Sequence, residues 1–318
     1  TGASNTAIGL GSLDANTTGG DNVAVGVAAL GANTTATENT AVGHRALLLT
    51  TTGTRNTGVG RDALCSNTTG ANNVAVGWEA GCSITDSVGH VAVGYEALQN
   101  TTTGDVNVAI GYRSLFSNTT ASNNTAVGAY ALCSNTTATN NTALGFSSLK
   151  STTTGNHNIA IGSCALCTST TSDRNVAIGN LALYAMTGSG DRNNTAVGYT
   201  AGCTITTGSN LTTLGYNAQP SSATATNEIT LGDTNVTTVR TNGSIIPFTT
   251  DAADLGSTSK VWRNIYTGDL HLSNEVKSEG NSIDGTKGNW TIQEGAEDLY
   301  ILNNKTGKKF KFKLEEIS

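Results

Sequence analysis

Glycine recurs every seventeen residues along most of this chain, and this period constrains the fold more than any other feature. The repeated unit reads roughly NTAVG, two variable residues, Ala-Leu, two more residues and NTTG, which is too little apolar material to close a core alone. Units of this kind bury their apolar residues by stacking on one another. The periodic glycines are Gly9, Gly26, Gly43, Gly60, Gly77, Gly94, Gly111, Gly128, Gly145, Gly162 and Gly179, then, after two extra residues, Gly198, Gly215 and Gly232. We therefore expect an all-β parallel β-solenoid (a β-roll) of 14 coils with 17 residues each, and a bulge between Gly179 and Gly198.

Charged residues are spread unevenly along the chain. Residues 1–232 carry 18 of them, whereas the last 86 residues carry 22. We therefore predict a solenoid shaft over residues 1–232, a connector over 233–250 and a β-rich C-terminal knob over 251–318. Apolar and polar residues alternate in the strand-like runs of the knob, which predicts one buried face and a core. The aromatic residues assigned to that core are Trp262, Tyr266, Trp290, Tyr300, Phe310 and Phe312.

The composition argues against several classes of function. The net charge is −6 and no basic run is present, so nucleic acid is not an expected partner. No apolar stretch approaches the roughly 18 residues of a membrane span, so we expect no membrane insertion. A uniform rod offers repeated surface rather than a catalytic pocket, and we predict that the protein is not an enzyme. No calcium-binding nonapeptide pattern occurs, and we expect no metal or cofactor.

The apolar residues of each coil predict two buried rows. The residue before each periodic glycine is always aliphatic, and we expect it to be buried. Strand alternation puts the preceding residue, usually Ala, on the opposite face. A row of such small side chains indicates close packing against another chain, so we expect a homotrimer with this face turned inward. The alanines concerned are Ala24, Ala41, Ala75, Ala92, Ala109, Ala126 and Ala143.

Leucine usually stands four residues after the glycine and gives each coil a second buried contact. Burying one such side chain is worth roughly 1.5–3 kcal/mol, while ordering each residue costs about 1.5 kcal/mol. A single column of coils is therefore marginal, which also favours the trimer.

Asparagine begins the strand in eleven of the fourteen units. Stacked amides can hydrogen-bond from copy to copy, so we predict an asparagine ladder. A second set of asparagines, in Asn-Thr-Thr, forms glycosylation sequons or shapes turns, and we favour turns. These are Asn16, Asn33, Asn67, Asn118 and Asn135.

The repeats resemble the head repeats of trimeric autotransporter adhesins, which are left-handed parallel β-rolls, and their NTT-Gly segment looks more like the related repeats of bacteriophage tail fibres. Three further segments are similar to phage fibres and tail proteins: Asn227–Gly232, Asp254–Gly256 with Trp262–Tyr266, and Trp290–Gly295 with Gly307–Phe312.

The resemblance implies an extracellular virion appendage. It also implies that the knob binds a host-surface glycan or protein. Thr1-Gly2 matches the end of a unit, so we expect a preceding segment that attaches to tail or baseplate proteins.

One column of side chains is a candidate glycan-contact surface. His44, Arg61, Trp78, Tyr95 and Tyr112 directly follow the glycine in five consecutive coils. Exposed aromatic rings at roughly 4.8 Å steps would form a platform for sugar rings. Stacking on each other or on trimer neighbours is the alternative interpretation.

Carboxylates form the next column. Asp62, Glu79 and Glu96 lie in adjacent coils, where a glycosidase pair is conceivable. Arg45 and Arg113 flank them in the same column, which favours a charge-balanced stripe.

Five of the six cysteines share the position five residues after the glycine. Cys65 and Cys82 occupy it in adjacent coils, at a separation compatible with a disulfide, although parallel side-chain directions disfavour the torsion. Cys164 and Cys167 form a single CxxC without a second pair or a suitable histidine, which argues against zinc and redox work.

These observations together favour a structural fibre of a phage or virus tail, with a trimeric shaft and a distal knob that attaches to the host surface. A bacterial cell-surface trimeric adhesin head is the first alternative. A polysaccharide-degrading tailspike is the second.

Overall fold

The computed structural model describes residues 2–242, 245–246, 258, 260–263, 265, 267–275, 285–296 and 298–312. Contacts within the chain divide it into one unit of Thr1–Thr237 and another of Thr238–Ser318. Asp254–Gly256, Asn264 and Tyr266, which contribute to the resemblance or to the predicted knob, lie outside the described residues.

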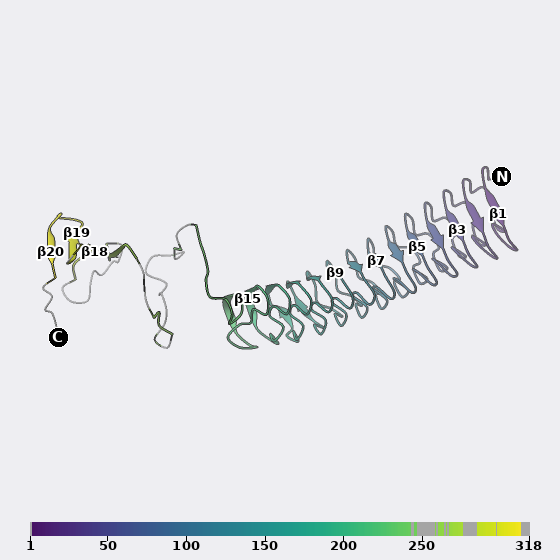
Figure 1. The fold of residues 1–318 in the computed structure, drawn as a ribbon. Coiled ribbons are helices and arrows are strands. Elements are labelled where there is room, and N and C mark those ends of the chain that lie inside the picture. Colours follow the sequence, from purple (N-terminus) through teal and green to yellow (C-terminus); the bar gives the residue numbers. More distant parts are fainter. Residues whose placement is uncertain are drawn as a thin grey trace. The chain divides into compact units, whose positions relative to one another are not determined.

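The first unit is a parallel β-solenoid (Figure 1). Its main sheet has 14 short strands in chain order, which correspond to about 13 turns. Consecutive strands pair in parallel, and neighbours in the regular coils are seventeen residues apart, as in Ala109↔Ala126. The strands are β1 (Thr6–Ile8), β2 (Val23–Val25), β3 (Thr40–Val42), β4 (Thr57–Val59), β5 (Val74–Val76), β6 (Val91–Val93), β7 (Val108–Ile110), β8 (Thr125–Val127), β9 (Thr142–Leu144), β10 (Ile159–Ile161), β12 (Val176–Ile178), β14 (Thr195–Val197), β15 (Ser209–Leu214) and β16 (Thr226–Leu231).

The two extra residues between Gly179 and Gly198 form the predicted bulge. Two minor strands, β11 (Ser172–Asp173) and β13 (Gly190–Asp191), pair in parallel beside the main sheet at this point. The main register continues past the insertion, because Val176 still pairs with Thr195.

The interior of most coils is filled by the leucine and by the small residue at the middle of the strand; where glycine replaces the leucine, at Gly81 and Gly202, Ile84 and Ile205 are buried instead. The alanines predicted to be closely packed are fully buried, as are the leucines from Leu30 onward that follow the glycine by four residues. The space is tight: a methyl group added at Gly58, at the middle of β4, would lie 3.2 Å from Leu47 Cγ. Only a small side chain therefore fits opposite the leucine column.

The two faces of the sheet are consequently the reverse of the prediction. The alanines face the interior of their own coil, so the expectation that they face partner chains is wrong. The aliphatic residue before the glycine, predicted to be always buried, instead points outward and is partly exposed, for example 37% at Val42 and 39% at Ile110. Alternation along the strand was predicted correctly, but the leucine decides which face is inside.

The periodic glycines stack in one column, as predicted. From Gly9 to Gly198, a side chain is excluded both by the backbone conformation and by the next coil. At Gly111, for example, φ is +134°, and an added Cβ would lie 2.6 Å from the carbonyl carbon of Gly128. Glycine is the residue that tolerates both this backbone conformation and this close approach of the next coil.

The leucine column also has a left-handed backbone conformation. Leu132, for example, has a φ of 50°. For a residue with a Cβ atom, this conformation is less stable than the right-handed one by roughly 1–2 kcal/mol. It is retained because the coil is fixed on its neighbour, with Leu132 N–H donating to the carbonyl of Ser148 at 3.0 Å.

Asparagines form two ladders. In the predicted ladder, Asn124 Oδ1 accepts from the backbone N–H of Asn141 at 3.0 Å, and Asn124 Nδ2 donates to the carbonyl of Ala138 at 2.9 Å. The main bonds are therefore amide to backbone rather than amide to amide. The sequon asparagines form the second ladder, in which Asn135 Nδ2 donates to Ala138 O and to Asn118 Oδ1.

The second unit contains one antiparallel sheet of β17 (Asp269–Ser273), β18 (Asn289–Glu294), β19 (Leu299–Asn303) and β20 (Lys309–Lys311). Trp290 and Phe310 contact each other with ring centroids 5.9 Å apart. Phe310 is nevertheless 46% exposed and Trp262 61% exposed. The predicted aromatic core is therefore wrong for the described residues, because they provide no second layer to cover the sheet.

Candidate functional site

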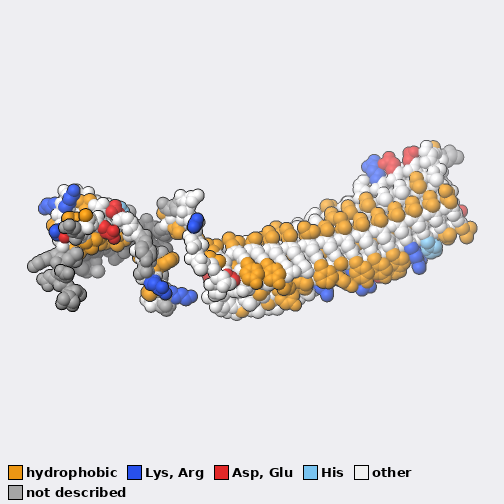
Figure 2. All heavy atoms as spheres, viewed as in Figure 1, with side chains coloured by type: hydrophobic (Ala, Val, Ile, Leu, Met, Phe, Trp, Pro, Cys, Tyr) orange, Lys and Arg blue, Asp and Glu red, His pale blue; other side chains and the backbone are white. Residues whose placement is uncertain are grey.

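The outer face of the 14-stranded sheet is an apolar strip. It consists of the aliphatic residue before each periodic glycine and of the Val, Ile or Thr residue two positions earlier on the same strand. Hydrophobic side chains run in rows along the shaft (Figure 2). Its partly exposed aliphatic members include Ile8, Val23, Val42, Val74, Val76, Ile110, Leu144, Ile159, Ile178, Leu214 and Leu231. A contiguous apolar surface of this length is typical of a protein interaction site. We call it the outer strip.

The predicted glycan-contact column lies beside the outer strip, and its aromatic members stack. Trp78 and Tyr95 are 4.8 Å apart between ring centroids and 11° from parallel, and Tyr95 and Tyr112 are 5.2 Å apart at 8°. His44 and Arg61 belong to the same column and are exposed, but they do not join the ring stack. Arg61 instead pairs with Asp62, at 3.1 Å between Nε and Oδ2.

The ring stack is longer than the sequence column indicates. Tyr130 packs edge-on against Tyr112 at 5.2 Å, and Phe146 packs edge-on against Tyr130 at 6.2 Å. Tyr130 was missed because it stands two residues after its glycine rather than one. The guanidinium of Arg113 lies 5.6 Å from the Tyr112 centroid, which adds a cation–π contact.

The geometry of the stack limits what it can bind. The faces of Tyr95 are covered by Trp78 on one side and by Tyr112 on the other, so the exposed 40% of its side chain presents edge and hydroxyl. A sugar ring stacks on an aromatic face, and both faces of Tyr95, in the middle of the column, are already covered by rings. Within a single chain, the rings therefore stack on each other, as the alternative interpretation predicted. Glycan contact stays a prediction.

The acidic column is charge-balanced, as predicted. Asp62 Oδ1 lies 3.3 Å from Arg45 Nε, and the nearly buried Glu96 pairs with Arg113. The hydrogen bond to Glu96 raises the pKa of Tyr95. Glu79 accepts a hydrogen bond from Gln99. Each carboxylate thus has a partner, and the arrangement stabilises neighbouring coils rather than forming a pair of free catalytic groups.

The sequon asparagines are positioned as turn residues. Asn33, Asn67, Asn118 and Asn135 are fully buried, and their amides bond to the backbone of the turn, as Asn33 Oδ1 does to Ala36 N–H at 3.0 Å. Asn16 is only partly buried, but its Nδ2 also donates to the turn, to the Gly19 carbonyl at 3.0 Å. A glycan on one of the four buried amides would displace these bonds in the folded coil, so the turn interpretation is confirmed for them.

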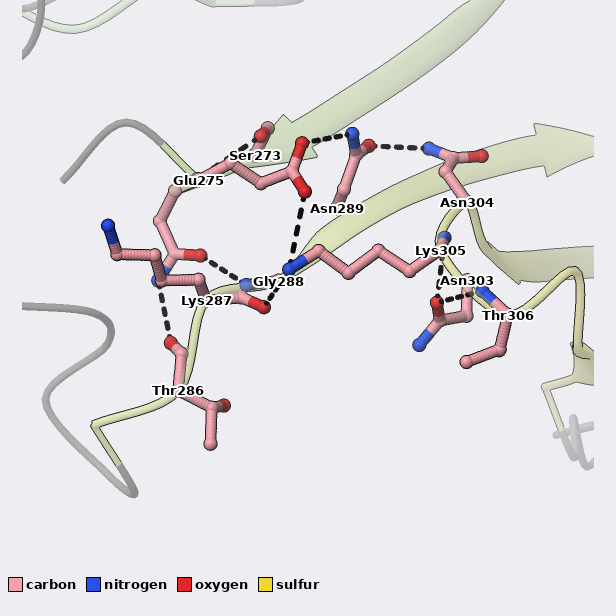
Figure 3. Close-up of polar contacts among 11 residues, drawn as sticks. Ser273, Glu275, Thr286, Lys287, Gly288, Asn289, Asn303, Asn304, Lys305 and Thr306 are labelled. Atoms are coloured by element: carbon pink, nitrogen blue, oxygen red, sulfur yellow. Dashed lines mark hydrogen bonds and ion pairs between the residues drawn. The ribbon is translucent and has the colours of Figure 1, made fainter.

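The second unit has a polar cluster at one end of its sheet (Figure 3). Glu275 lies 3.2 Å from Lys305 Nζ and accepts from Asn289 Nδ2 at 2.8 Å, and these contacts lower its pKa. Asn304 Nδ2 donates to Asn289 Oδ1 at 2.8 Å. The lysine and glutamate side chains are 43% and 42% exposed, so the cluster joins β18 to the turn after β19 in contact with water.

Two further features are not found in the part of the chain that the structure describes. It contains no group of three or more His, Cys, Asp or Glu side chains arranged to hold a metal ion. It also contains no helix of the length and hydropathy that a bilayer crossing requires. Comparison with protein-family models, with curated proteins and with solved structures gave no match for this chain.

Proposed function

We propose that this chain is a structural fibre protein of a phage or virus tail, whose solenoid is the shaft of a homotrimer and whose C-terminal part attaches to the host surface. The observation that carries the proposal is the outer strip, in which the aliphatic residue before the glycine is exposed or partly exposed in every coil of an otherwise well-buried solenoid. Covering a half-exposed aliphatic side chain is worth roughly 1 kcal/mol, so a strip of this length provides a strong drive for association.

Another copy of the same chain is the partner that fits this surface. The strip repeats once per coil over 14 strands, and a partner must have the same rise per coil to remain in register along that length. A second and a third copy satisfy this condition because they have the same coils. The assembly then places the outer strips inward, and the alanines stay inside each coil. Three copies, rather than two, follow from the resemblance to trimeric fibres and adhesin heads.

The oligomer is tested by placing charge in the strip. Val76→Asp with Ile110→Asp adds two carboxylates to the outer strip, and burying them between chains would be costly. Thr69→Asp with Thr103→Asp adds the same charge to exposed turns of the coils just before those two strands and serves as the matched control. Light scattering should give three times 32.3 kDa for the wild type and the control, and a lower mass for the strip variant. A folded wild-type monomer would contradict the trimer.

The biological role is tested by locating the protein. Immunogold labelling of particles and cells from the producing culture should mark a tail appendage. Label on the cell envelope would favour the adhesin head, and release of sugars from purified polysaccharide would favour the tailspike.

Host attachment is tested by competition. The purified full chain should reduce adsorption of the particle to its host. Replacing Trp78, Tyr95 and Tyr112 by alanine should leave that competition unchanged if the C-terminal part makes the contact. Loss of competition would move the contact to the aromatic column.

A further inference from the structure

Two cysteines lie directly above one another in the shaft. Cys65 and Cys82 each follow a periodic glycine by five residues, in consecutive coils whose strands pair as Val59↔Val76. Their Cα atoms are thus separated by about one coil spacing, roughly 4.8 Å. This separation falls within the range of about 4.4–6.8 Å that disulfides require.

The Cys65 side chain leans along the shaft toward the coil that carries Cys82. Cys65 Sγ donates to the carbonyl oxygen of Cys82 at 3.5 Å. The Cys65 sulfur therefore already lies against the backbone of Cys82. Cys133 shares the column, but its neighbours there are Phe116 and Lys150, so it lacks a thiol in either adjacent coil.

The contact also activates the pair. The hydrogen bond between the thiols lowers the pKa of Cys65 to about 7, although burial and the charge of Asp62 act in the opposite direction. The same bond, together with burial, raises the pKa of Cys82. The pair thus loses its first proton near neutral pH, and the two sulfurs share the proton that remains. A thiolate is the form of cysteine that reacts with disulfides.

We propose that Cys65 and Cys82 form a disulfide that links two successive coils of the shaft when the chain meets a small-molecule disulfide as oxidant. Cys82, the more exposed of the two, passes its proton to the Cys65 thiolate, attacks one sulfur of the oxidant and expels the other half as a thiolate. Cys65 then gives this proton to solvent and attacks Cys82 Sγ, which releases the second half. The protein loses two hydrogens and forms one S–S bond, and the oxidant is reduced to two thiols.

The proposed link lies outside the outer strip, so it is compatible with any oligomeric state. It restrains a loop of seventeen residues and ties together two coils in the N-terminal half of the solenoid. A solenoid opens coil by coil, so a covalent link between neighbours suppresses local opening on both sides. Hydrogen exchange at backbone amides of these coils should slow by up to about a hundredfold on oxidation.

The test is peptide mapping of the full chain after equilibration with oxidised glutathione. Remaining thiols are blocked, and trypsin then releases Asp62–Arg113, which contains these two cysteines as its only ones and no internal lysine or arginine. We expect this peptide to carry no blocking group and to be 2 Da lighter than its reduced form. A second cleavage after Trp78 separates the two cysteines in sequence, and the fragments should stay joined until reduction.

Three variants complete the design. Cys82→Ser should leave Cys65 available to the blocking reagent, Cys65→Ser should do the same for Cys82, and Cys133→Ser should change neither the link nor the exchange rates. Blocking groups on both Cys65 and Cys82 in the oxidised wild type would overturn the proposal. So would a link that joins either cysteine to a second chain or to another position.

Discussion

The solenoid and the C-terminal sheet are both built from short strands, but they obtain their burial in different ways. In the solenoid, each coil covers the next, so alanine, leucine and asparagine side chains become fully buried in a chain with few apolar residues per coil. Among the residues described after Thr237, only Thr291 is buried, and Leu272 on β17 is 47% exposed. In a repeat protein, each coil therefore buries the apolar residues of its neighbour, whereas a single four-stranded sheet needs a second layer from another part of the protein or from a partner.

The largest expected effect comes from the glycine column. Gly111→Ala forces an alanine into a φ of +134° and brings its Cβ 2.6 Å from a backbone atom of the next coil. We expect a loss of at least about 3 kcal/mol in the free energy of unfolding, measured by guanidinium titration followed by circular dichroism.

The matched control for this prediction is in the other unit. Gly268→Ala meets no atom within 4 Å, and its backbone is not in the positive-φ region. This variant should unfold like the wild type. Equal losses in the two variants would mean that the close stacking of coils is not what the glycines protect.

The second prediction compares buried and exposed asparagines. Asn124→Ala removes an amide that is fully buried and leaves the Ala138 carbonyl and the Asn141 N–H without partners. The expected cost is about 2–3 kcal/mol. Asn304→Ala removes a bond of similar length to Asn289 from an exposed turn, where water replaces it, and a bond to Thr291 Oγ1, which keeps its contact with His271 Nδ1, so it should cost about 0.5 kcal/mol or less. Thermal denaturation measures both, and a cost at Asn304 equal to that at Asn124 would contradict the comparison.

The period of the glycines was sufficient to predict the coils, their parallel stacking and the position of the bulge. It was not sufficient to assign the faces of the sheet. Val25 and Ala24 are both apolar, so alternation places them on opposite faces without deciding which is inside. That decision depends on Leu30 and its counterparts, which have a left-handed backbone and fill the coil interior. A leucine with a positive φ is disfavoured in isolation, so no local propensity indicates this turn.

The sequence predicted the position of the candidate site but not its detailed geometry. The spacing of Trp78, Tyr95 and Tyr112 correctly places them in one column, because residues seventeen apart share a position. The orientation of the rings could not be predicted, since it depends on side-chain torsions that bring the faces together. In the C-terminal unit no repeat relates one strand to another, so the contact of Glu275 with Lys305 and Asn289 has no signature in the sequence.

The smallest expected effect concerns His90, which replaces asparagine in the first ladder. Its Nδ1 accepts from the backbone N–H of Asn107 at 3.2 Å, and the side chain is 1% exposed. Burial lowers the pKa of His90, although the Gly104 carbonyl and Asp105 act in the opposite direction. Protonation would also place a hydrogen on the nitrogen that accepts the bond from Asn107.

The sign of the pH dependence follows from this lowered pKa. Below the ordinary histidine pKa of 6.5, the unfolded chain binds a proton that the folded ladder does not. Stability is therefore complete above about pH 6.5 and falls as the pH decreases below it. His90→Asn restores the repeated residue and should reduce the loss of stability between pH 7 and pH 5. This effect should be smaller than the cost of Gly111→Ala or of Asn124→Ala. The exposed His44→Asn is the matched control. If His44→Asn changes the acid profile as much as His90→Asn does, burial in the ladder is not the cause.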